Sequence, residues 1–158
     1  FNDAMGAIIT FAVLGIATRD EWLTGIDFLA PHTPPCAPST PLAREAARQL
    51  AAYLADPAFV FDLPLDPAGT PFRQRVWQAL RRIPPGETRS YGELAASMGS
   101  APRAVGQACG DNPIPLLIPC HRVLAKNGPG GFMHARGGHS LAIKHWLLRH
   151  EGCRRGAA

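Results

Sequence analysis

The stretch "TPFRQRVWQALRRIPPGETRSYGELAASMGSAPRAVGQACG", residues 70–110, is the most informative about the fold because it holds three successive helix patterns. Thr70 can cap the first helix, a proline follows at the first helical position, and "PPGE" ends it. Ser90 can cap a second, short helix that stops at Gly99, and a third helix begins near Pro102. Two short helices joined by a tight glycine-containing turn are typical of a helix-turn-helix.

The third of these helices is built from small residues, with Gly106 near its middle. A glycine there costs about 1 kcal/mol relative to alanine, so close approach by another surface would explain it. That surface is either a nucleic-acid groove or a neighbouring helix, and the sequence favours neither. Arg103 begins the helix, where a long cation can enter a base stack or contact phosphate.

The charge of the chain is divided unequally along its length. Residues 1–70 carry three arginines against eight acids, whereas residues 71–158 carry thirteen lysines and arginines against four acids. Five of the six histidines also lie in the second half. A basic module of this kind favours a polyanionic partner, with nucleic acid as the first candidate. A solvated basic face is the alternative.

The first half alternates strand and helix patterns around a proline-rich loop. We predict strands over residues 6–17, 23–29 and 59–65 and a helix over 42–56. Composition and charge both change near residue 67, where we place a domain boundary. The predicted fold class is α+β, with a small N-terminal domain of sheet and helix over residues 1–66 and a helical C-terminal domain over residues 67–158.

The cysteine pattern indicates a reducing compartment. The four cysteines form no CxxC pair and no zinc-ligand spacing, so we expect free thiols and no metal site. The apolar run 6–17 is too short to cross a bilayer, and no lysine or arginine precedes it as in a signal peptide. We expect a cytoplasmic protein with no membrane partner.

The stretch "NPIPLLIPCHRV", residues 112–123, is an apolar, strand-like run that ends on Cys120 and His121. Cysteine is a nucleophile only as the thiolate, and a neighbouring histidine can take its proton. Glu151, in "RHEG", is a candidate to orient the imidazole. A buried, inert cysteine beside a structural histidine is the alternative.

Several motifs resemble those of the O6-alkylguanine-DNA alkyltransferase family. They are "TPFRQRVWQALRRIPPGETRSYGELA", "RAVGQACGDNP", "IPCHRV" and "KHWLLRHEG", and together they cover residues 67–158 closely. Residues 1–66 match only by the order of their elements. The resemblance implies an RNase H-like N-terminal domain and a winged-helix-like C-terminal domain.

The resemblance also implies an activity. The chain would move an alkyl group, typically methyl, from O6-alkylguanine and O4-alkylthymine in double-stranded DNA to Cys120, once per molecule. His121 would be a water-bridged base with Glu151 behind it. Asn112 would link the recognition helix to the active-site turn, and Tyr91 would lie near the flipped base. The family works as a monomer without metal or cofactor, in a bacterial-type cytosol with the nucleoid or in a nucleus.

The implied DNA contacts come from the helix-turn-helix, which lies in the minor groove in this family. Arg103 would fill the space of the extruded nucleotide, beside Ala104, Gly106 and Tyr91. Arg122 would serve structure or contact phosphate. Flipping is required physically, because guanine O6 is out of reach of a buried thiolate in a stacked duplex.

The alkyl pocket is where this sequence departs from the family. Pro119, Phe132 and Met133 are its expected lining, yet the loop 128–140 is about four residues longer than usual. Phe132 stands near the place of the family's tyrosine, and His134 has no counterpart. The turn "MGSAP" is about two residues short.

Two other functions stay open from the sequence. The first is a lesion-recognition protein that binds alkylated DNA without reacting, although its known relatives lack the cysteine. The second is a Cys-His hydrolase, which the absence of a visible oxyanion loop argues against.

Overall fold

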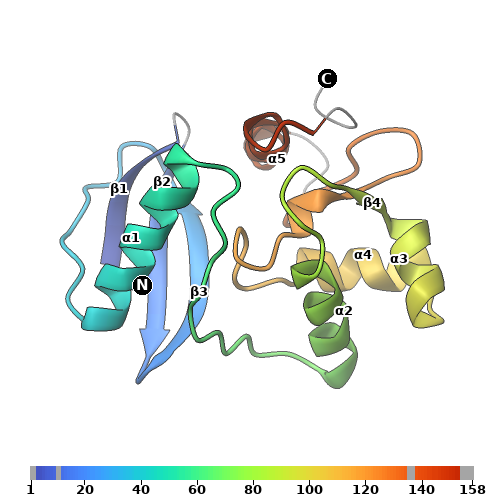
Figure 1. Cartoon of the computed structure of the whole chain (residues 1–158), viewed down its shortest axis with the longest axis horizontal. Helices are drawn as coiled ribbons and strands as arrows, with labels where there is room; N and C mark the ends of the chain where they lie inside the picture. The colour runs from blue at the N-terminus through green and yellow to red at the C-terminus, as the bar shows by residue number, and fades with distance from the viewer. Residues whose placement is uncertain (1–2, 10–11, 135–137, 154–158) are drawn as a thin grey trace. The chain divides into compact units, whose positions relative to one another are not determined.

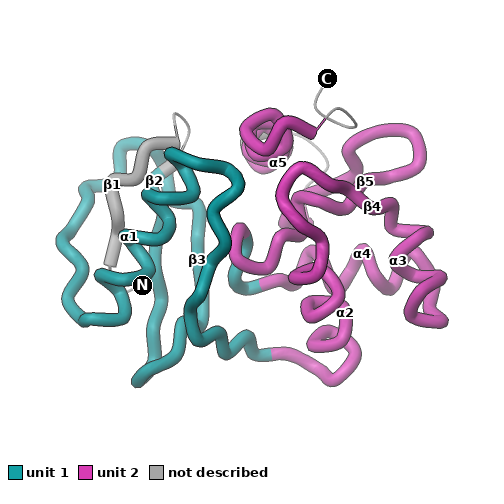
Figure 2. Tube along the Cα trace, in the orientation of Figure 1, with its two compact units in different colours: residues 1–68, 113–115 teal, residues 69–112, 116–158 magenta. Residues whose placement is uncertain are grey.

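The computed structural model describes residues 3–9, 12–134 and 138–153 of the 158-residue chain. Its contacts divide the chain into two compact units, shown in different colours in Figure 2. The first comprises residues 1–68 with 113–115, and the second comprises residues 69–112 with 116–158. The first combines a sheet with one helix and the second is mainly helical. The predicted α+β class is therefore confirmed.

The first unit is built on an antiparallel sheet in the order β1-β2-β3 (Figure 1). Its strands are Asp3–Ile9, Ala12–Arg19 and Trp22–Leu29. The single strand expected over residues 6–17 was wrong, because this stretch contributes to two strands of a hairpin. A continuous apolar run does not mark where a chain reverses direction.

Helix α1, Pro41–Ala55, belongs to the same unit and buries the stripe Ala43, Ala46, Leu50 and Tyr53. The side chain of Thr40 caps it by accepting from the Ala43 amide.

The strand expected over residues 59–65 does not form, and only Leu65 makes an isolated bridge, to Leu23. Instead, the Gln49 amide pairs with both backbone groups of Asp62. Pro64 has no N–H to donate to a ladder.

The second unit begins with α2, Pro71–Arg81, whose cap is the predicted Thr70: its hydroxyl accepts from the Arg73 amide. Trp77 is fully buried in this helix, a position that the expected apolar stripe does not include. Its indole Nε1 donates to the Ala108 carbonyl at 2.9 Å. This contact ties α2 to α4, the helix that carries Arg103.

Helices α3, Tyr91–Met98, and α4, Pro102–Gly110, form the predicted pair of short helices. Ser90 and Glu93 form a capping box at the start of α3. Gly99 ends α3 in the left-handed conformation, at φ +63°, where glycine avoids the steric cost of a Cβ. Strand β4, Arg89–Ser90, pairs in parallel with β5, Val123–Leu124, and so places the start of α3 near the active-site segment.

The run before Cys120 is not the expected strand. Residues 112–119 form turns and bends, with Leu116 at φ +76°. Its prolines have no N–H and disfavour a strand ladder. The chain then enters a short 3₁₀ helix, Cys120–Arg122.

The last helix, α5, spans Gly138–His150 and begins two residues before the expected Ser140. Its basic last turn, Arg149 and His150, precedes Glu151. Within the described ranges, no helix combines the length and apolar character needed to cross a bilayer.

Candidate active site

Cys120 is the first residue of the 3₁₀ helix and is only 3% exposed. It lines a cleft in the second unit together with Tyr91 of α3 and Arg103 and Gly106 of α4. The cleft measures about 1310 Å³, above the roughly 300–1,000 Å³ of small-ligand pockets. The buried thiol therefore borders the same space as the helix-turn-helix.

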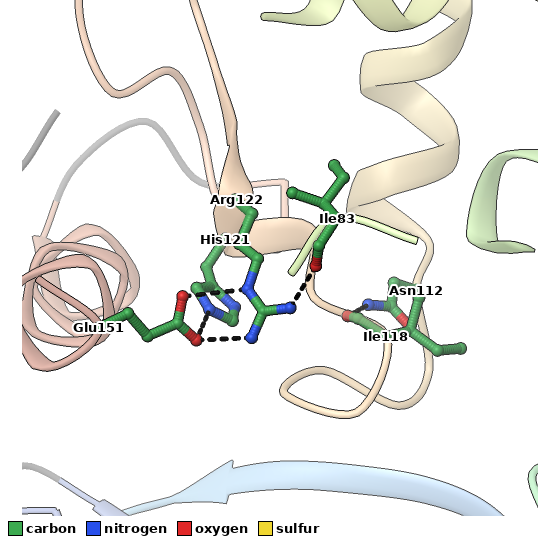
Figure 3. Close-up of polar contacts among 6 residues, drawn as sticks. All are labelled: Ile83, Asn112, Ile118, His121, Arg122 and Glu151. Atoms are coloured by element: carbon green, nitrogen blue, oxygen red, sulfur yellow. Dashed lines mark hydrogen bonds and ion pairs between the residues drawn. The ribbon is translucent and has the colours of Figure 1, made fainter. Parts of the chain in front are cut away.

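His121, Arg122 and Glu151 form a buried cluster beside Cys120 (Figure 3). Nε2 of His121 lies 2.8 Å from Oε1 of Glu151. Arg122 approaches the same carboxylate with two nitrogens: Nε donates to Oε2 at 3.0 Å and an Nη to Oε1 at 2.8 Å. Such a two-pronged pair is strong and fixes the carboxylate in one orientation.

The ionisation of Glu151 decides the tautomer of His121. Burial alone raises the pKa of Glu151, but hydrogen bonds and charge from His121 and Arg122 outweigh it and hold that pKa far below its usual value. An ionised carboxylate only accepts hydrogen bonds, so Nε2 of His121 carries the proton. The other ring nitrogen, Nδ1, is buried, makes no hydrogen bond with the described residues and keeps its lone pair.

His121 is therefore suited to act as a base. Burial lowers its pKa, against the opposing effect of Glu151, so the ring is neutral at neutral pH. Once protonated, the ring would face the Glu151 carboxylate, which stabilises the imidazolium.

Two neighbouring side chains favour the thiolate form of Cys120. Burial raises the pKa of its thiol, while hydrogen bonding from Asn112 and the positive charge of Lys144 act in the opposite direction. Asn112 follows α4 closely and also donates from Nδ2 to the Ile118 carbonyl at 2.8 Å (Figure 3). This contact joins the residue that follows the cap of α4 to the turn before Cys120.

Arg122 is 7% exposed. Its remaining Nη donates to the Ile83 carbonyl at 2.6 Å, beyond the end of α2. These contacts with Glu151 and Ile83 lie inside the unit, which favours the structural role that the sequence left open over a phosphate contact.

Gly106 resolves one alternative from the sequence. A Cβ added there would meet no atom within 4 Å, so packing inside the chain does not require glycine. Arg103 is exposed at the start of the same helix. The space beside Gly106 is therefore open, as an approach by another molecule would require.

The expected pocket residues fall in two groups. Phe132 and Met133 line the cleft, whereas Pro119 is buried and does not border it. Tyr91 donates its hydroxyl to the Gly131 carbonyl at 3.4 Å, and burial raises its pKa. Ala104 is partly buried and is also not among the cleft residues.

Two residues of the site were missed from the sequence. Lys144 of α5 is fully buried, its Nζ donates to the carbonyls of Val123 and Gly131, and burial lowers its pKa to about 8. Cys109 of α4 lines the same cleft as Cys120. A lone lysine within the apolar run "LAIKHWLL" was the available signal for Lys144. Among the described residues, no group of His, Cys, Asp and Glu is arranged to hold a metal ion.

A helix-turn-helix that shares a cleft with a buried cysteine next to a histidine is the arrangement expected of a DNA-binding protein with a cysteine nucleophile. Residues 71–153 match the family model described as the 6-O-methylguanine DNA methyltransferase DNA-binding domain. The chain belongs to the 6-O-methylguanine DNA methyltransferase family.

Curated relatives carry the same assignment. The constitutive methylated-DNA–protein-cysteine methyltransferase of Bacillus subtilis is 49% identical over 114 residues, which is 71% of this chain and 67% of that protein. The methylated-DNA–protein-cysteine methyltransferase of Methanosarcina acetivorans is 49% identical over 112 residues, or 69% of each chain.

Solved structures extend the similarity over both units. The Mycobacterium tuberculosis O6-methylguanine methyltransferase matches with a TM-score of 0.78 at 37% identity, covering 98% of this chain and 94% of that one. The M. tuberculosis protein in complex with DNA gives a TM-score of 0.74 at 40% identity, covering 92% and 90%. The fold of the first unit, which matched the family only loosely by sequence, is therefore also found in these solved structures.

Proposed function

We propose that this chain repairs DNA by moving a methyl or larger alkyl group from O6 of guanine, and from O4 of thymine, to Cys120. The observation that carries the proposal is that Cys120 opens onto the cleft bordered by Arg103 and Gly106 of the helix-turn-helix. A nucleophile used on a free small molecule would not need this position. The family and its relatives support the same reaction.

The first step is removal of the thiol proton. His121 accepts it at Nδ1 through one bridging water, because Nε2 already carries a proton that is held by Glu151. The thiolate then attacks the alkyl carbon. A Sγ–C bond forms, the C–O6 bond breaks, and its electron pair leaves with the guanine.

The leaving guanine anion requires a hydrogen-bond donor. Tyr91 keeps its hydroxyl proton at neutral pH, since burial raises its pKa above an already high ordinary value, and that proton would turn from the Gly131 carbonyl to the base. The thioether product is stable in water, and each chain therefore reacts once. No step requires a metal or an organic cofactor.

The alkylated base reaches Cys120 by flipping out of the duplex, at a cost of a few kcal/mol. We assign α4 to the minor groove, where Gly106 allows close approach and Arg103 replaces the extruded nucleotide in the stack. A relative solved in complex with DNA supports DNA as the partner. The protein would act as a monomer on DNA in a cytosol or nucleus.

Intact-protein mass spectrometry tests the proposal. The protein is incubated with a duplex carrying one O6-methylguanine, then digested and mapped. We expect one added methyl group, on the Cys120 peptide, and none for Cys120→Ser. Cys109→Ser is a matched control in the same cleft and should still gain the methyl group. Binding without any mass change would favour a lesion-recognition protein instead.

A further inference from the structure

The segment Gly131–His134, on the loop that is longer than usual, is held at both of its ends. At one end, the Gly131 carbonyl accepts from Lys144 at 2.9 Å. At the other end, Nε2 of His134 lies 2.7 Å from Oδ1 of Asp111, which caps the C-terminus of α4. Phe132 and Met133, between these anchors, line the same cleft as Cys120. The anchors therefore control how far these two side chains can retreat.

The anchor at His134 is stronger than a single exposed ion pair, because a second charge and close packing support it. The second oxygen of Asp111 pairs with Arg73 of α2 at 2.6 Å, so the carboxylate is fixed from two sides. Gly110, the last residue of α4, lies under the imidazole, and a Cβ added there would overlap the ring. A single exposed pair contributes little by itself, but here charge and close packing hold the same ring.

The backbone of this segment also needs an external restraint. Met133 and His134 both have positive φ, 52° and 63°. Two successive non-glycine residues in the left-handed region are unfavourable for L-amino acids, and such conformations persist where surrounding contacts impose them. The contact of His134 with Asp111 and Gly110 supplies that restraint.

We propose that His134 determines the size of the alkyl group that Cys120 accepts. Its contact with Asp111 and Gly110 keeps Met133 against the cleft, and releasing Met133 would admit bulky groups such as benzyl more readily. The inference rests on the proposed alkyl transfer. His134 is a positioning residue, because it acts through Met133 and not on the reacting atoms.

The test compares two duplexes that are identical except for one O6-methylguanine or one O6-benzylguanine. Single-turnover rates of Cys120 alkylation are measured by mass spectrometry. The benzyl-to-methyl ratio is compared between variants, because DNA affinity contributes equally to both rates. His134→Asn keeps a residue that tolerates the left-handed backbone but shortens its reach to Asp111. We expect it to raise the ratio on the order of tenfold, since small changes of volume in an apolar pocket have effects of this size.

Three further variants complete the test. Gly110→Ala displaces the ring while keeping every charged group, and it should raise the ratio in the same direction. His134→Gln returns an amide donor within reach of Asp111 and should bring the ratio back toward wild type. His32→Asn changes an exposed histidine of the first unit and should leave the ratio unchanged.

The outcomes separate the inference from the proposed function. If wild type transfers methyl but the ratio is unchanged or falls in both His134→Asn and Gly110→Ala, the inference is overturned and alkyl transfer stands. If wild type alkylates Cys120 with neither duplex, alkyl transfer itself fails. A lowered thermal unfolding midpoint identifies a variant that is misfolded. In that case the benzyl-to-methyl ratio of the other variant, His134→Asn or Gly110→Ala, decides whether the inference holds.

Discussion

Among single residues, Glu151 is central because one carboxylate orients His121 and neutralises Arg122. Glu151→Gln keeps the shape but leaves the Arg122 guanidinium buried without a counter-charge. We expect a loss of about 3–5 kcal/mol in the free energy of unfolding and alkyl transfer slower by roughly 10²-fold or more. Urea unfolding and single-turnover rates measure the two effects, with Glu87→Gln, an exposed acid of the same unit, as control.

The same residue predicts a pH dependence. The folded pKa of Glu151 lies below its ordinary value of 4.5, so its stabilisation is present above that pH and is lost as pH falls toward the folded pKa. The pKa of His121 is also lowered in the folded state, so its contribution to stability is likewise lost as pH falls below the ordinary imidazole value of 6.5. Wild type should therefore lose stability on acidification more steeply than Glu151→Gln. Parallel curves would contradict the ionised state assigned to Glu151.

Asn112 gives a prediction for the nucleophile. Because its hydrogen bond favours the Cys120 thiolate, Asn112→Ala should raise the pKa of that thiol. The pH profile of iodoacetamide labelling at the Cys120 peptide should move to higher pH. Asn127→Ala, at an exposed loop position, should leave the profile in place, and an unmoved profile in Asn112→Ala would remove Asn112 from the site.

Among the elements, the packing of α2 against α4 positions the recognition helix. Trp77→Phe would leave the buried Ala108 carbonyl without its donor, which costs about 1–3 kcal/mol, and the smaller ring adds a cavity. Urea unfolding measures the loss. Trp22→Phe, at a residue 48% exposed, should change stability by no more than about 0.5 kcal/mol. Equal losses in the two variants would mean that the indole contact does not stabilise the helix pair.

Local signals explain which elements were predicted well from the sequence. The caps at Thr70, Ser90 and Gly99 act within one helical turn, so the starts and stops of α2 and α3 follow from neighbouring residues. The hairpin within residues 6–17 was missed because its apolar run contains no glycine or proline between Ile9 and Ala12 to mark the reversal. The missing strand at 59–65 instead depends on a different segment, through the hydrogen bonds of Gln49 with both backbone groups of Asp62. No local pattern encodes those contacts.

For the molecule as a whole, the basic second half predicts salt-dependent DNA binding. The logarithm of the duplex affinity should fall linearly with the logarithm of salt concentration, by about 0.9 per phosphate neutralised. If Arg103 enters the base stack, Arg103→Ala slows alkyl transfer with the salt slope unchanged. A slope reduced by about one would make Arg103 a phosphate contact. Arg48→Ala, in α1 and paired with Glu45, serves as the control.

Short motifs, and helix signals that act between near neighbours, were enough to predict the family and the α+β class, which are confirmed. The same signals predict the two-part organisation and Cys120, His121 and Glu151 as the candidate reactive group. The folded chain was needed to show which nitrogen of His121 is free, that Arg122 serves the carboxylate, and that Lys144 and His134 anchor the atypical loop. Those contacts join residues 13 to 30 positions apart, and burial, which sets their charges, exists only once the chain has folded.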